Sequence, residues 1–189
     1  TQLYPILRPR SGNYFYDEEE LAILQKDIAI CKELGCDGIS VGVATIDATI
    51  DTERLKRIVE WAYPMRVTCN RAFDGTPDPF EALEALVACG CERVLTSGQK
   101  SAAPHAGAVL QELVAQAGNR IIVMPGAGIN SSNIKQLREA CNAVEFHASA
   151  RKVQPNPLTY INTQISDYGN VYVADEAEVR SMVSILLAT

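Results

Sequence analysis

The sequence predicts an α/β fold in which parallel strands are joined by crossover helices. Three observations predict this fold class. Short β-branched runs alternate with longer stretches in which apolar residues recur at three- and four-residue steps. Glycines follow several of the helical stretches, where a left-handed residue commonly ends a helix. Strand and helix together repeat six times, and this order is typical of parallel strands linked through helices.

The expected strands are rich in β-branched residues, and several of them are not strictly alternating. Continuous apolar runs of this kind are typical of a parallel sheet that is buried on both faces. The expected strands are Tyr4–Arg10, Gly38–Ala44, Arg66–Phe73, Arg93–Gly98, Ile121–Ile129 and Val144–Arg151.

The expected helices lie between these strands and after the last one. Asp17 with Glu20 three residues later predicts a capping box at the first helix, and Gly35 and Gly90 predict helix ends. The expected helices are Glu18–Leu34, Thr52–Ala62, Pro79–Cys89, Gly107–Ala117, Ser131–Ala140 and Asp175–Leu187.

Length and charge limit the classes of function. The 189 residues predict a single domain over 1–189, and 17 Lys and Arg against 23 Asp and Glu give a net charge of −6. An acidic chain without basic clusters argues against nucleic acid or an anionic membrane as a partner. No apolar run approaches the ~20 residues of a membrane helix, and the first residues lack a signal-peptide pattern. We therefore expect a cytoplasmic protein with reduced cysteines.

Two architectures use repeated strand–helix units, namely a closed barrel and an open doubly wound sheet. The glycine fingerprint of dinucleotide-binding sheets is missing after the first strand, and Gly126-Ala127-Gly128 is too short to match it. Polar residues instead follow the C-terminal ends of most strands, as on the active face of a barrel. Six strands are fewer than the eight of a full barrel. The sequence therefore predicts an incomplete TIM (β/α) barrel whose open edges stay unpaired or are closed by another chain in a homo-oligomer.

The polar residues at the strand ends predict a site for a small anion. Guanidinium groups that converge on one opening favour phosphate or carboxylate, and a glycine turn before a helix adds backbone N–H donors. The alternative is that each arginine pairs with a local carboxylate, such as Asp74 or Glu145. The candidate anion-binding residues are Arg8, Arg10, Asn70, Arg71, Thr96, Ser97, Gly126, Gly128, Ser149 and Arg151.

His147 and Asp74 are the candidates for acid–base chemistry at this opening. His147 shares a face of the expected strand Val144–Arg151 with Glu145, Ser149 and Arg151, and it could act as a general acid or base or as a metal ligand. The alternative is a hydrogen-bonded barrel histidine without a catalytic role. Asp74 could act as a base or orient the neighbouring Arg71.

The cysteines offer soft ligands, because Cu(I) prefers thiolate and thioether sulfur. Cys89-Gly-Cys91 could chelate a soft metal, but no C-x-x-C spacing occurs. Cys69 is the candidate metal ligand nearest to the strand ends. Strand alternation sets it opposite to Thr68 and Asn70, toward the helices, so core packing is the alternative role. Packing roles are also expected for Cys31, on a helix face, and for Cys36, Cys91 and Cys141, which precede strands.

Several motifs resemble those of the CutC-type copper homeostasis proteins. Arg8-Pro-Arg10, with Gly12 and Tyr16, resembles the family signature IRPRGGDFxYS, and Val67–Asp74 resembles VTFHRAFD. Ser11, Asn13 and Cys69-Asn70 depart from these signatures, so that an amide stands where the family has a histidine. The later matching segments are Arg93–Gly98, Met124–Gly128, Glu145–Arg151, and Val173–Asp175 with Val179 and Arg180.

The resemblance implies a TIM-barrel fold of which this chain corresponds to strand–helix units three to eight. It also implies a role in copper homeostasis, through cytosolic Cu(I) binding or trafficking or through copper tolerance, rather than catalytic turnover. The cysteines associated with Cu(I) in the family lie on the two strands that have no counterpart here, so copper as a partner rests on the resemblance alone. The alternative function is an enzyme that acts on a small phosphorylated or carboxylated substrate at the strand ends.

Overall fold

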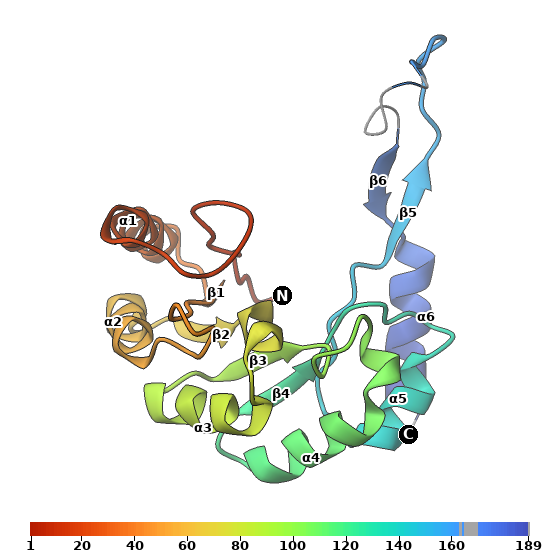
Figure 1. Ribbon diagram of the computed structural model, residues 1–189. Helices are drawn as coiled ribbons and strands as arrows, with labels where there is room; N and C mark the ends of the chain where they lie inside the picture. The colour runs from red at the N-terminus through yellow and green to blue at the C-terminus, as the bar shows by residue number, and fades with distance from the viewer. Residues whose placement is uncertain (163, 165–169, 189) are drawn as a thin grey trace.

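The computed structural model describes residues 1–162, 164 and 170–188, and it contains a curved parallel sheet backed by helices (Figure 1). Its strands lie in chain order, β1 (Gly38–Val41), β2 (Arg66–Cys69), β3 (Arg93–Thr96) and β4 (Ile122–Pro125). All three pairings in this sheet are parallel over the described residues. Parallel bridges from Ile6 to Ser40 and from Gly126 to His147 add one segment at each edge. The predicted (β/α) barrel class is confirmed, and the described strands do not close into a full barrel.

The helices follow the predicted positions closely. Asp17 and Glu20 form the predicted capping box, in which the Glu20 N–H donates to Asp17 Oδ1 at 2.9 Å. Among the described helices, none is long and apolar enough to cross a membrane. The helices are α1 (Glu18–Glu33), α2 (Thr52–Ala62), α3 (Pro79–Cys89), α4 (Gly107–Ala117), α5 (Ile134–Cys141) and α6 (Glu176–Leu187), with short 3₁₀ turns η1 (Arg71–Gly75) and η2 (Ala103–His105).

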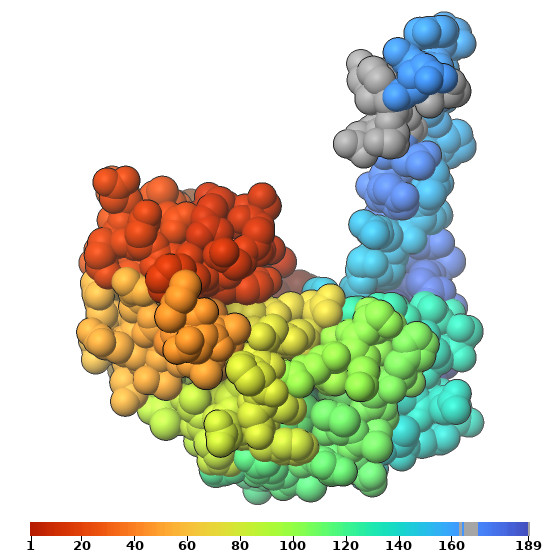
Figure 2. All heavy atoms as spheres, in the orientation of Figure 1, coloured from red at the N-terminus to blue at the C-terminus, as the bar shows by residue number. Residues whose placement is uncertain are grey.

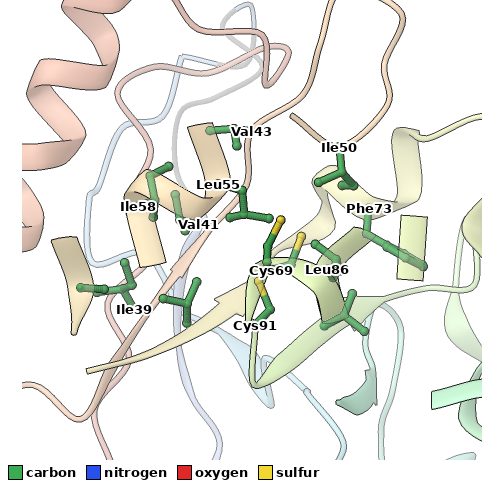
Figure 3. Packing of buried hydrophobic residues seen from close by; sticks show 14 of the residues in the cluster. Ile39, Val41, Val43, Ile50, Leu55, Ile58, Cys69, Phe73, Leu86 and Cys91 are labelled. Carbon is green, nitrogen blue, oxygen red and sulfur yellow. The ribbon is translucent and has the colours of Figure 1, made fainter. Parts of the chain in front are cut away.

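Strand alternation divides the sheet into an outer and an inner face. The outer face carries apolar side chains such as Ile39 and Val41, which pack with Leu55, Ile58 and Leu86 of the helices (Figure 3). The inner face is concave and lines a cavity of about 440 Å³ in the part of the chain that the structure describes. The residues around this cavity include Tyr4, Ile6, Ser40, Thr68, Arg93, Leu95, Met124, Glu145 and His147.

The predicted strand Val144–Arg151 differs from the structure. Only His147 pairs with the sheet, and the chain turns at Ala150, which has a left-handed φ of +41°. Residues from 151 onward instead form an antiparallel hairpin of β5 (Arg151–Gln154) and β6 (Val171–Ala174). This hairpin projects from the body of the molecule (Figures 1 and 2). Arg151 therefore lies on the hairpin and does not share a strand face with His147.

Candidate functional site

The C-terminal ends of the parallel segments lie side by side, because each segment pairs in parallel with the next. Asn70 directly follows β2 and caps the η1 turn, since its side chain accepts a hydrogen bond of 2.9 Å from the N–H of Ala72 within that turn. Gly42 allows this arrangement, since a Cβ atom at Gly42 would lie 2.3 Å from Asn70 Oδ1. The η1 turn after Asn70 therefore lies at the opening formed by the strand ends, which we call the rim.

Asp74 links this turn to the end of β3. Its carboxylate accepts a hydrogen bond of 2.5 Å from the Thr96 hydroxyl and one of 3.1 Å from the Ser97 N–H. Arg71 donates from Nε to Asp74 at 2.7 Å and from Nη2 to the Ser97 hydroxyl at 3.0 Å. Thr96 and Ser97 are fully buried. The predicted candidates Arg71, Asp74, Thr96 and Ser97 therefore form one network, in which Asp74 is fully engaged as an acceptor.

Arg8 and Arg10 shape the loop that leads into α1. Arg10 pairs with Glu20 at 2.5 Å and also donates to backbone carbonyls of the loop, including that of Phe15 at 2.8 Å. Arg8 donates to the carbonyl of Gly12, and its guanidinium carbon lies 4.5 Å from the centre of the Tyr14 ring. Both arginines thus hold the loop in place.

Pairing with carboxylates removes charge that the anion hypothesis needs. Arg10 is neutralised by Glu20, and Arg71 by Asp74. Among the described residues, Arg8 has no carboxylate partner at salt-bridge distance. The anion-binding site therefore remains a prediction. Of the predicted arginines at this opening, Arg8 is the one without a carboxylate partner among the described residues.

The predicted residues from the last strands are only partly brought together. Gly126 hydrogen-bonds to the Thr96 carbonyl at 2.8 Å and pairs with His147, so both lie beside the Asp74 network. A Cβ at Gly128 would lie 3.0 Å from Ala102 Cβ, which places Gly128 against the loop after β3. Ser149 is exposed and precedes the turn into the hairpin.

Arg151 is separate from the other predicted residues. Its guanidinium lies 4.7 Å from the centre of the Tyr172 ring, on the partner strand of the hairpin. Its exposed side chain stabilises the hairpin by stacking, and it is not grouped with Arg8, Arg10 and Arg71.

Arg93 lies on the inner face of the sheet and is not among the site residues predicted from the sequence. Arg93 pairs with Glu145 at 2.5 Å and with Glu92 at 2.9 Å, and its guanidinium carbon lies 5.2 Å from the centre of the Tyr4 ring. This cluster ties β3 to both edges of the sheet. Successive side chains of a strand point to opposite faces of the sheet. Val94 faces outward, so this alternation could have shown that Arg93 and Leu95 face inward.

His147 lines the same cavity, and partial desolvation of its imidazole there lowers the pKa from the ordinary value of 6.5. As the pH falls, His147 is therefore protonated at a higher pH in the unfolded chain than in the folded chain. We expect the free energy of unfolding to be highest above pH 6.5 and to decrease as the pH falls through 6.5 toward the folded-state pKa. Urea unfolding from about pH 7.5 to about pH 5 measures this slope, which His147→Asn should reduce. If the slope is unchanged in His147→Asn, His147 is not the group that causes the pH dependence.

The cysteines are all free and buried. Cys69 faces the helices, as alternation predicted, and lies near Cys91 in the main core cluster (Figure 3). Burial raises the pKa of the Cys69 thiol well above its ordinary value and that of Cys91 to about 12, which keeps both protonated. Within residues 1–162, 164 and 170–188, no three His, Cys, Asp or Glu side chains gather closely enough to hold a metal ion together.

Comparison with known proteins identifies similar chains. A sequence profile of the CutC family matches residues 1–152. The family protein CutC of Parabacteroides distasonis is 43% identical over 173 residues, which cover 92% of this chain and 71% of the relative. The family protein CutC of Xanthomonas campestris is 40% identical over 185 residues, which cover 97% and 77% of the two chains.

Solved structures are similar in fold. The structure described as copper homeostasis protein CutC, from Streptococcus agalactiae, superimposes with a TM-score of 0.72 at 30% identity and covers 75% of this chain and 70% of that one. A mandelate racemase/muconate lactonizing enzyme from a marine actinobacterium superimposes with a TM-score of 0.64 at 12% identity, covering 98% of this chain and 45% of that one. This second likeness concerns the fold alone.

Proposed function

The chain belongs to the CutC family, and we propose that it works in copper homeostasis by binding Cu(I) through its own cysteine thiols. The observation that carries the proposal is the family match over residues 1–152, a range that contains all six cysteines. The role is binding or transfer of the ion, not turnover of a substrate.

The chemistry of the side chains supports this proposal. Cu(I) is a soft cation that prefers thiolate ligands, and all six cysteines, which lie in the described part of the chain, are free thiols. A reducing compartment keeps thiols in that state, so the proposal places the chain in the cytosol. Copper is cargo in this role and not a catalytic cofactor.

Anaerobic competition against a coloured Cu(I) chelator tests the proposal on the full chain. We expect at least one Cu(I) to transfer from the chelator to the protein, with an affinity better than about micromolar. X-ray absorption at the copper edge should then show sulfur ligands. Failure of the chain to take Cu(I) from the chelator, or a copper site without sulfur, would overturn the proposal.

A further inference from the structure

Two cysteines, Cys31 and Cys36, lie at the cap that ends α1. Gly35 has a left-handed φ of +72° and donates to the Lys32 carbonyl at 3.1 Å, while the Cys36 N–H donates to the Cys31 carbonyl at 3.0 Å. This pair of hydrogen bonds is a Schellman cap, which brings the side chains before and after the turn into contact. Cys31 and Cys36 are the two residues that this cap joins, and both are buried. The cap therefore places the two cysteine side chains beside each other.

The end of α3 has the same cap but only one thiol at the matching positions. There Gly90 has a φ of +83° and donates to the Val87 carbonyl, and the Cys91 N–H donates to the Leu86 carbonyl at 3.1 Å. Leu86 thus occupies the position that Cys31 occupies in α1. Because a leucine satisfies the cap at α3, the fold does not require a second thiol at α1.

The α1 thiols are slightly more exposed than Cys69 and Cys91. Cys31 and Cys36 have exposed fractions of 6% and 9%, against 5% for Cys89, 3% for Cys91 and 1% for Cys69. Lys32, Glu33, Leu34 and Gly35 between them are all exposed. An ion could therefore reach this pair by a small movement of the helix end, whereas Cys69 and Cys91 lie between the sheet and its helices (Figure 3).

We propose that Cys31 and Cys36 form a two-coordinate Cu(I) site, an inference that rests on the proposed function. Each thiol loses its proton and each sulfur donates one electron pair to Cu(I), so binding releases two protons and leaves the oxidation state of copper unchanged. A structural Zn²⁺ site takes four ligands, and the described residues offer no group of three His, Cys, Asp or Glu side chains. A pair of thiolates therefore favours a soft ion that accepts few ligands.

The test compares the unaltered chain with three variants in the anaerobic Cu(I) competition. Cys31→Leu copies the arrangement at α3, so it should keep the fold, which circular dichroism can check. Cys91→Ala is the matched control, since it removes a thiol from the equivalent cap. We expect Cys31→Leu to bind one Cu(I) fewer than the unaltered chain and Cys91→Ala to bind the same number. Cys36→Ala, which removes the other ligand, should repeat the loss.

Alkylation followed by mass spectrometry gives a second measurement on the unaltered chain. Bound Cu(I) should protect Cys31 and Cys36 from a thiol reagent more than it protects Cys89. If the unaltered chain binds Cu(I) and Cys31→Leu binds it equally, the proposed site is wrong while the proposed function stands. If the unaltered chain takes up no Cu(I), the proposed function itself fails.

Discussion

Asp74→Ala is expected to lower the free energy of unfolding by about 2–4 kcal/mol, because it removes one acceptor from several buried donors. The Thr96 hydroxyl and the Ser97 N–H both donate to Asp74, and both residues are fully buried. Without the carboxylate these donors are left unsatisfied, and Arg71 loses its ion pair. Urea unfolding at neutral pH measures the change.

Glu84→Ala is the matched control for Asp74→Ala. Glu84 also pairs with an arginine, Arg120, at 2.7 Å, but both side chains are about half exposed. Water replaces a lost partner at such a site, so this substitution should change stability far less. Equal effects of the two substitutions would show that the hydrogen bonds of Asp74 to the end of β3 do not stabilise the rim.

Phe73→Ala should have the largest effect, a loss of about 3–5 kcal/mol in the free energy of unfolding. Phe73 is fully buried and packs in the main core cluster with Ile50 and Leu86 (Figure 3). Truncation leaves a cavity under the η1 turn, which the surrounding side chains fill only in part. Chemical denaturation of the full chain provides the measurement.

Phe15→Ala controls for the loss of an aromatic ring as such. Phe15 is 42% exposed, so its truncation should change the free energy of unfolding by no more than about 1 kcal/mol. A comparable loss in both variants would mean that Phe73 does not anchor the turn. Phe73 and Asp74 together hold the η1 turn in place. The Phe73 side chain packs into the core, and the Asp74 carboxylate accepts hydrogen bonds from the end of β3.

Much of the fold could be predicted from local patterns. Periodic apolar residues and caps located all the helices that the structure describes, and α2, α3 and α4 have the predicted bounds. The predicted helix Ser131–Ala140 begins later, at Ile134, because Asn130 accepts a hydrogen bond from the Ser132 N–H and holds a turn. Such a side-chain bond competes with the helix and is hard to distinguish from a cap in the sequence.

The candidate site was less predictable, because its contacts join residues far apart in the chain. Sequence analysis placed Arg71, Asp74, Thr96 and Ser97 at strand ends, and the structure joins them in one network. It did not anticipate that Arg10 pairs with Glu20, or that Arg93 occupies the inner face with Glu145. Which arginine takes which carboxylate depends on strand register and loop path.

The sequence by itself determined the order of the parallel strands β1 to β4 and of the six helices, the outward direction of Cys69 and the family to which the chain belongs. These follow from the period of apolar residues and from short motifs, both of which are local properties of a chain. Only the tertiary structure decided the pairing of charges at the rim, the hairpin that begins at Arg151 and the contact between Cys31 and Cys36. The physical reason is that a side chain's partners and a turn's direction are set by the backbone conformation and packing around it, which residue type alone leaves open.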